Sequence, residues 1–262
     1  NGSFVQIDEE NGTVTGYTTK NSGGVPDNFR NYFVMKFDKP FASAEVWSGD
    51  KIIKGKREVE DNHVGAVLGF KTYKGEKIGV KVSSSFISEE QAWLNLEELG
   101  SRNFNEVKES ARNAWNDVMN RVRVEQTKEA GRKAWNNVLG RIKVEDSDEN
   151  RMRTFYSCLY RSLLFPRKFY EVDKYGNIVH YSPYNGEVRR GYMYTDTGFW
   201  DTFRALFPFL NLMYPSVNKE IQEGLANSYE ESGFLPEWAS PGHRDCMVGN
   251  NSASVVADAY IK

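Results

Sequence analysis

Short hydrophobic segments separated by polar turns occupy the first third of the 262-residue chain. Four of them combine β-branched and aromatic residues and are bounded by Gly, Asp or Pro: Asn31–Asp38, Ser43–Gly49, Gly65–Tyr73 and Lys77–Ser88. Short strands with this punctuation are typical of an antiparallel β-sandwich. We therefore predict a sandwich up to about Phe86, with a loop at residues 21–28 (NSGGVPDN).

After Ser88 the apolar residues follow the period of a helix. Ser88 and Gln91 form a capping-box pattern before the segment AWLNLEEL. Asp146 and Glu149 repeat the pattern before an apolar stripe that ends at Pro166: Met152, Phe155, Leu159 and Leu163. The chain from this point is predicted to be mostly helical.

Two more helices are predicted towards the C-terminus. Ser216 precedes apolar residues at helical spacing (Val217, Ile221 and Leu225), and Gly233 follows them. Ser252 or Ser254 is expected to begin a last helix. Loops rich in Tyr and Gly, notably residues 170–194, are predicted between the helices.

A tandem repeat lies where the period changes. Residues 112–125 (RNAWNDVMNRVRVE) resemble residues 132–145 (RKAWNNVLGRIKVE), and their tryptophans, Trp115 and Trp135, would lie roughly 200° apart on one continuous helix. We interpret the repeat as two helix-then-strand units in a linker. The predicted organisation is a β-sandwich at 1–99, this linker at 100–147 and a helical domain at 148–262.

Composition excludes some classes of function. Lys and Arg number 34 and Asp and Glu 36, a formal charge of -2 that does not favour nucleic-acid or membrane-surface binding. The apolar runs are far shorter than the roughly 20 residues that cross a bilayer. Cys158 and Cys246 are expected to be small buried residues, although they could form one bridge. Because the last helix has no cap, we expect a larger protein.

No common catalytic motif occurs in the sequence: HExxH, paired CxxC, the P-loop, the Gly-rich dinucleotide fingerprint and GxSxG are all missing. The candidates are instead polar residues among aromatic ones. Trp200, Asp201 and Arg204 lie in TDTGFWDTFRALFPF, and Glu237 and Trp238 lie in GFLPEWASPGHRD. Asn250 and Asn251 follow in CMVGNNSA. Each stretch is predicted as a loop that leads into a helix, where scaffolds often carry a site.

These residue types suit a sugar. An indole can cover the apolar C–H face of a pyranose, while Asp or Asn binds hydroxyls and Arg supplies a fixed fork of donors. We expect Asp201 to be partly buried between Phe199 and Phe203, so that its carboxylate needs a partner or a use.

Simpler explanations compete for each candidate. Asp201 and Arg204 have the spacing of a helix ion pair, and Asp196 or Thr197 could be an N-cap. Glu237 and His243 could be an exposed loop acid and a surface imidazole. The pair Asn250–Asn251 could cap a helix, and it also begins an N-x-S sequon.

The same stretches resemble glycoside hydrolase family 92. The similarity lies in TDTGFWDTFRALFPF, in GFLPEWASPGHRDCMVGNNSASVVADAYIK, in FYSCLYRSLLFPR and at the domain junction, SFISEEQAWLNLEEL and AWNNVLGRIKVE. It covers most of the chain and is weakest before Asn28. The second AWN copy, near Trp135, is an insertion relative to the family.

The resemblance implies a fold and a set of residues that form the wall of the sugar-binding site. The fold is a multidomain α+β one, an N-terminal antiparallel β-sandwich followed by the first helices of an (α/α)6 toroid, with the site between the domains. Trp200 and Asp201 would line the subsite of the terminal mannose, and Arg204 would brace that loop. Glu237, Trp238, Asn250 and Asn251 would be further wall residues.

The resemblance also implies an activity. Family members are calcium-dependent, inverting exo-α-mannosidases, so we expect release of terminal mannose from mannosides or N-glycans with Ca²⁺ as cofactor. The general acid and base are expected beyond Lys262, and the calcium ligands are not identified. A bacterial, periplasmic or secreted location is expected. The alternatives are a carbohydrate-binding fragment without catalysis and a helical-toroid glycosidase for another sugar.

Overall fold

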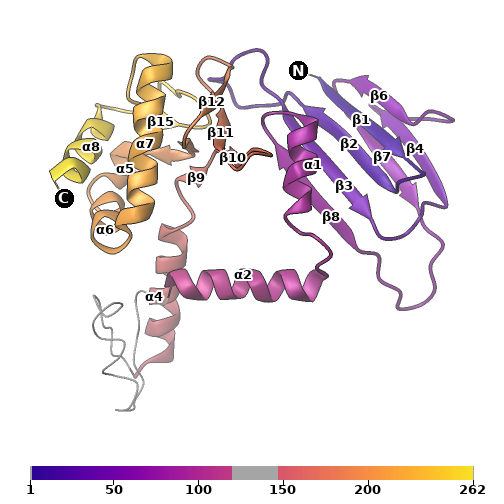
Figure 1. Cartoon of the computed structure of the whole chain (residues 1–262), viewed down its shortest axis with the longest axis horizontal. Coiled ribbons are helices and arrows are strands. Elements are labelled where there is room, and N and C mark those ends of the chain that lie inside the picture. Colours follow the sequence, from indigo (N-terminus) through magenta and orange to yellow (C-terminus); the bar gives the residue numbers. More distant parts are fainter. Residues whose placement is uncertain (1, 120–146, 262) are drawn as a thin grey trace.

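The structure is a computed structural model that describes residues 2–119 and 147–261. Its N-terminal part is built of strands and its C-terminal part mainly of helices (Figure 1). One antiparallel sheet has the order β6-β1-β2-β3-β8, with bounds Glu58–Asp61, Ser3–Asp8, Thr13–Thr18, Asn31–Phe37 and Val80–Ser85. The other has the order β5-β4-β7, with bounds Lys51–Ile53, Ser43–Ser48 and Val64–Gly69.

The two sheets pack face to face, so the predicted sandwich is confirmed. Their shared core contains five buried residues from β1, β2 and β4: Val5, Ile7, Val14, Ala44 and Val46. The predicted strand at 65–73 ends at Gly69, and the one at 77–88 begins at Val80. Between them Tyr73 and Glu76 form a turn, in which the Glu76 N–H donates to the Tyr73 carbonyl over 3.1 Å.

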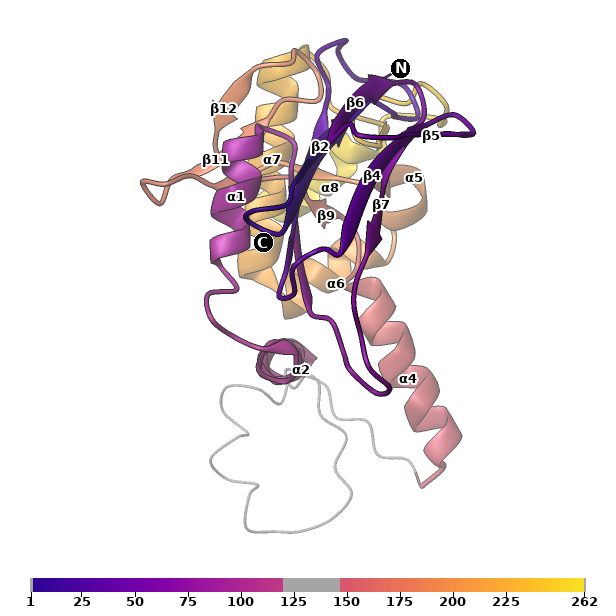
Figure 2. The same cartoon turned by 90° about the vertical axis from the view of Figure 1, so that its right-hand side faces the viewer.

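Strand β3 is buried on both faces. Phe33 and Met35 face the sandwich core, whereas the alternate residue Val34 contacts helix α1 (Glu89–Glu97). The helix and the three-stranded sheet lie on opposite sides of the larger sheet (Figure 2). Ser88 is the N-cap of α1, and its hydroxyl accepts from the Gln91 N–H over 3.1 Å. The Gln91 side chain instead donates to the Val172 carbonyl, so only half of the predicted capping box forms.

In the described ranges on either side of residues 120–146, the next helices are α2 (Phe104–Met119) and α4 (Glu149–Ser162). The Trp115 and Tyr160 rings lie 4.7 Å apart and join them. The N-cap of α4 is Asp148, whose carboxylate accepts from the Asn150 N–H over 2.8 Å. Asp146, Trp135 and both predicted linker strands lie outside the described residues.

The predicted loop at 170–194 contains short strands. Strands β10 (Glu171–Val172), β11 (Ile178–Tyr181) and β12 (Val188–Arg190) form one antiparallel sheet. Strands β9 (Arg167–Lys168) and β13 (Tyr194–Thr195) form another pair. Their short lengths hid them among the turn-forming residues of the sequence.

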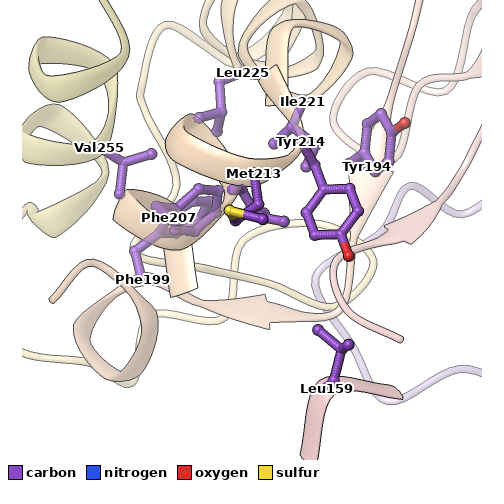
Figure 3. Packing of buried hydrophobic residues seen from close by; sticks show 10 residues of the cluster. Leu159, Tyr194, Phe199, Phe207, Met213, Tyr214, Ile221, Leu225 and Val255 are labelled. Carbon is purple, nitrogen blue, oxygen red and sulfur yellow. The ribbon is translucent and has the colours of Figure 1, made fainter. Parts of the chain in front are cut away.

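A second core lies among the C-terminal helices α5 (Phe199–Thr202), α6 (Leu206–Met213), α7 (Pro215–Ser232) and α8 (Asn251–Ile261). Phe199, Phe207, Tyr214, Ile221 and Val255 are all buried there (Figure 3). The last two predicted helices are present, but their starts differ. Helix α7 begins at Pro215 after Tyr214, because proline suits the first helical position, and α8 begins at Asn251.

Both cysteines are exposed and free, contrary to the prediction. On α4 the core-facing position belongs to Leu159, and the adjacent Cys158 points elsewhere because successive helical residues turn by about 100°. Among the described residues, no helix has the length and apolar character needed to cross a membrane.

The two parts of the molecule share a third core. Phe29 and Phe86 from the N-terminal part pack with Phe169, Tyr181 and Met193. Glu171 adds polar contacts, since its carboxylate accepts from the Ser85 hydroxyl at 3.0 Å and the Phe86 N–H at 2.9 Å.

Candidate functional site

Two of the predicted site stretches lie side by side. Strand β14 (Thr197–Gly198) pairs antiparallel with β15 (Trp238–Ala239), with Gly198 opposite Trp238. The Phe199 N–H continues the pairing and donates to the Glu237 carbonyl over 3.1 Å. The pairing therefore joins the start of α5 to the loop that carries Glu237 and Trp238.

Gly198 leaves room for the side chains around it. A Cβ atom placed there would lie 2.8 Å from Asp201 Oδ2 and 3.8 Å from Trp238 Cδ2. The carboxylate and the indole thus approach the same bare backbone position. Asp201 and Trp238 belong to stretches that are separate in the sequence, and the β14–β15 pair brings them together.

Helix α5 divides its residues between core and solvent. Phe199 is 2% exposed and stacks on Phe207, with ring centroids 5.6 Å apart. Trp200 is 43% exposed, and Asp201 is also exposed. The expectation of a partly buried Asp201 was wrong, because two helical steps of about 100° each turn it away from the side that Phe199 buries.

Arg204 contacts Trp200 in place of the ion pair with Asp201. Its Nη1 donates to the Trp200 carbonyl over 3.1 Å. The guanidinium also lies over the rings of Trp200 and Phe203, at 5.0 and 4.3 Å from their centroids. These contacts fix the Trp200 ring from one side.

The helix-cap alternative for Asp196 and Thr197 was also wrong. The N-cap of α5 is Gly198, which has no side chain. Asp196 has a positive φ of 58° and pairs with Arg167 Nη2 at 2.7 Å, while the Ser240 hydroxyl donates to it over 2.9 Å. Thr197 belongs to β14, and its buried hydroxyl has no partner among the described residues.

His243 is not a surface imidazole. Its Nε2 lies 2.9 Å from the Ser232 hydroxyl, and its ring centroid lies 4.7 Å from that of Tyr184. Burial lowers its pKa from 6.5, and the negative charges of Asp245 and Glu237 oppose that shift in part. Glu237 itself is partly buried, so it is not simply an exposed loop acid.

Asn250 and Asn251 lie at the start of α8, which packs against α5. Asn250 is exposed and accepts from the Ser252 hydroxyl over 2.7 Å, and Asn251 Nδ2 donates to the Val248 carbonyl over 3.1 Å. Both contacts are local to the helix start, and neither is the side-chain bond to a backbone N–H that defines an N-cap. Within the described residues the pair makes no hydrogen bond to Trp200 or Asp201.

Two domain models of one protein family match this sequence. Residues 1–85 match the glycosyl hydrolase family 92 N-terminal domain, and residues 124–262 match the family 92 catalytic domain. The chain belongs to glycoside hydrolase family 92. The resemblance seen in the sequence is confirmed, and both candidate stretches around Gly198 fall within the catalytic-domain match.

Solved structures of family 92 have the same fold. An inverting mannosidase of the family from Bacteroides thetaiotaomicron VPI-5482 is 44% identical, with a TM-score of 0.88 over 99% of this chain and 33% of its own. A second family 92 α-mannosidase from Bacteroides thetaiotaomicron, in complex with mannoimidazole, is 24% identical, with a TM-score of 0.80 over 100% of this chain and 33% of its own. A comparison with curated proteins gave no match.

The chain therefore spans about a third of the length of the family 92 structures it matches. These matches confirm the predicted fold class, a β-sandwich followed by the first helices of the toroid. The domain bounds at 99 and 147 remain predictions, because the family matches end at 85 and resume at 124.

The predicted site residues lie apart from the cavity among the C-terminal helices. A cavity of about 620 Å³ lies among α6, α7 and α8, and its lining includes none of the predicted site residues. No cluster of three or more His, Cys, Asp or Glu residues in the described ranges fits a metal ion. The calcium ligands are therefore not identified among the described residues.

Sequence reasoning missed Gly198, Asp196 and Ser240 as organisers of the wall. Gly198 lies in the stretch TDTGFWDTFRALFPF. The only feature of the sequence that could have pointed to its role is its lack of a side chain close to Trp200 and Asp201. The contact between Ser240 and Asp196 joins residues 44 positions apart, a pairing that local spacing does not encode.

Proposed function

We propose that this chain forms part of an exo-acting, inverting α-mannosidase, and that Trp200 and Asp201 line the subsite of the terminal mannose. One observation carries the proposal: the Asp201 carboxylate and the Trp238 indole approach the same bare backbone position at Gly198, and the exposed Trp200 precedes Asp201 on α5. The 44% identity to an inverting mannosidase supports the choice of sugar, which a fold alone would not specify.

The wall suits sugar binding for physical reasons. Trp200 offers an exposed indole face to the C–H groups of a pyranose. Arg204 holds Trp200 in place by donating to its carbonyl and by lying over its ring. The Asp201 carboxylate accepts hydrogen bonds from hydroxyls at the ring's edge. Glu237, Trp238, Asn250 and Asn251 are proposed as further wall residues.

An inverting mechanism needs a protonated acid at the leaving oxygen and a carboxylate that activates water on the opposite face. The two stand roughly 6.5–9.5 Å apart, which leaves room for the water. We assign neither role to Asp201 or Glu237 and propose that both groups lie beyond Lys262. In this proposal the described residues bind and orient the sugar.

Three further points complete the proposal. Calcium, if the protein uses it as its family does, is held by residues outside those described, so no step here depends on it. The parts of the chain are a sandwich at 1–99, a linker at 100–147 and the start of the toroid at 148–262. Its substrates are mannosides or N-glycans, and its location is periplasmic or secreted.

The test is binding of mannoimidazole and methyl α-D-mannoside by calorimetry, with methyl α-D-glucoside as the competing sugar. We expect a preference for the mannose ligands and about a tenfold loss of affinity in Asp201→Asn, the equivalent of ~1.4 kcal/mol. Asp117→Asn, at an exposed acid on α2, is the matched control and should bind as the unaltered protein does. Equal affinity in the two variants would contradict the role of Asp201.

A hydrolysis panel on the whole enzyme, of which this chain is proposed to form part, separates the alternatives. Mannoside hydrolysis that is lost with a chelator supports the mannosidase. Glucoside hydrolysis that survives the chelator favours a toroid glycosidase of other specificity, and sugar binding without any hydrolysis favours a binding fragment.

A further inference from the structure

The loop that carries the Glu237–Trp238 wall is held from two sides. On one side β15 pairs with β14, and the Thr195 hydroxyl donates to the Pro241 carbonyl over 3.1 Å. On the other side residues 242–244 meet the turn at residues 22–24 of the N-terminal domain. The wall loop is therefore a bridge between the two domains.

The meeting point has no room for side chains. A Cβ atom at Gly242 would fall on the Gly24 carbonyl oxygen and lie 2.8 Å from the Pro183 carbonyl oxygen. A Cβ atom at Gly24 would fall on the His243 carbonyl oxygen. The two backbones thus touch directly, and Gly24 also has a positive φ of 72°.

A charged side chain secures the same contact. Arg244 Nη1 donates to the Ser22 carbonyl over 2.6 Å and lies 3.1 Å from the Ser22 hydroxyl. Hydrogen bonds from an ionised donor are about twice as strong as neutral ones. The turn at residues 22–24 is thus tied to the segment after the wall by backbone contact and by this side chain.

Backbone hydrogen bonds within residues 239–243 connect Gly242 to the strand that contains Trp238. The Ser240 N–H donates to the Gly242 carbonyl over 2.8 Å, and Ala239 forms an isolated β-bridge with His243. Ala239 is the strand neighbour of Trp238 in β15. A shift at Gly242 must therefore pass to the β15 strand within a few residues.

We propose that the N-terminal domain positions the sugar-binding wall through this contact, with Gly24, Gly242 and Arg244 as positioning residues. The inference rests on the proposed function, which makes Trp238 and Asp201 part of a sugar-binding site. It adds that the sandwich domain sets the orientation of Trp238 relative to Asp201.

Gly23 provides a matched control. It lies beside Gly24 and also has a positive φ, of 99°, but a Cβ atom there would meet nothing within 4 Å. Gly23→Ala and Gly24→Ala thus share the backbone strain of a left-handed residue. Only Gly24→Ala displaces the wall loop.

The experiment measures the fluorine NMR shift of Trp238 in protein labelled with fluorotryptophan, alongside the affinity for methyl α-D-mannoside. Trp238→Phe assigns the signal, and Trp47 in the sandwich serves as an internal reference. We expect Gly24→Ala to move the Trp238 signal and to weaken binding by about tenfold, because a small misplacement of binding groups is costly. Gly23→Ala should change neither.

Arg244 gives a second route if Gly24→Ala fails to fold. Arg244→Gln should move the Trp238 signal, and Arg244→Lys, which keeps a charged donor, should restore it in part. An unmoved Trp238 signal in Gly24→Ala and Arg244→Gln would overturn the inference. Absence of sugar binding in the unaltered protein would instead contradict the proposed function, while the Trp238 signal still decides the positioning role.

Discussion

The backbone around Gly198 determines whether each side chain faces the core or the solvent. Phe199 turns inward to Phe207, and Trp200 and Asp201 turn outward. The sequence showed the residue types needed for a sugar wall, but flanking phenylalanines alone did not reveal the exposure of Asp201. Exposure depends on where a four-residue helix begins, and Gly198 sets that start.

His243 gives a prediction about pH. Burial lowers its pKa below 6.5, so between that lowered pKa and 6.5 the unfolded chain binds more protons than the folded one. The free energy of unfolding should therefore fall as the pH drops through about 6.5. In His243→Gln, which can still bond to Ser232, we expect a smaller fall. Urea unfolding at pH 7.5 and pH 5.5 checks this, and an equal fall in both proteins would contradict it.

At the scale of elements, the sequence predicted what depends on local spacing. Leu159 of the predicted α4 stripe and Ile221 and Leu225 of α7 are buried in the core, and Phe155 and Leu163 pack against it. The four predicted strands are present as β3, β4, β7 and β8. Helix starts were less predictable, because α7 follows Tyr214 and not Ser216, and the N-cap of α4 is Asp148 and not Asp146. Strands of two residues, such as β14 and β15, have too few positions to show a period, so their pairing was not predictable.

The β14–β15 pair leads to a test of Gly198. Its φ of -99° suits any residue, so Gly198→Ala adds no backbone strain. The new Cβ would lie 2.8 Å from Asp201 Oδ2, and the exposed carboxylate can move away. We expect the melting temperature to change little while mannoside affinity falls as far as in Asp201→Ala. Calorimetry of the double variant should show no further loss, and additive losses would contradict the shared mechanism.

At the scale of the whole molecule, the two domains meet through a carboxylate as well as an aromatic core. Glu171 accepts hydrogen bonds from Ser85, Phe86 and Asn95, all in the N-terminal part. The rings of Phe86 and Phe169 lie 4.6 Å apart beside it. The family resemblance predicted a site between the domains, but only the structure identifies the residues that join them.

Glu171→Gln tests this joint. The amide replaces one acceptor oxygen by a donor that faces other donors, so we expect a loss of about 1–3 kcal/mol in the free energy of unfolding. The domains should also unfold less cooperatively, which differential scanning calorimetry would show as a broader or split transition. Glu97→Gln, at an exposed acid on α1, is the control. A single, unshifted transition in Glu171→Gln would show that the aromatic core suffices.

The contact between Ser22 and Arg244 joins residues 222 positions apart, nearly the full span of the chain. During synthesis on the ribosome, the turn at residues 22–24 emerges early and must wait for residues 242–244. The sandwich and its local strand pairs can form in that interval, since domains generally fold as units and the N-terminal one first. The contact that positions the proposed sugar-binding wall can therefore form only after residues 242–244 emerge, and a nascent chain arrested before them would contain a folded sandwich without that contact.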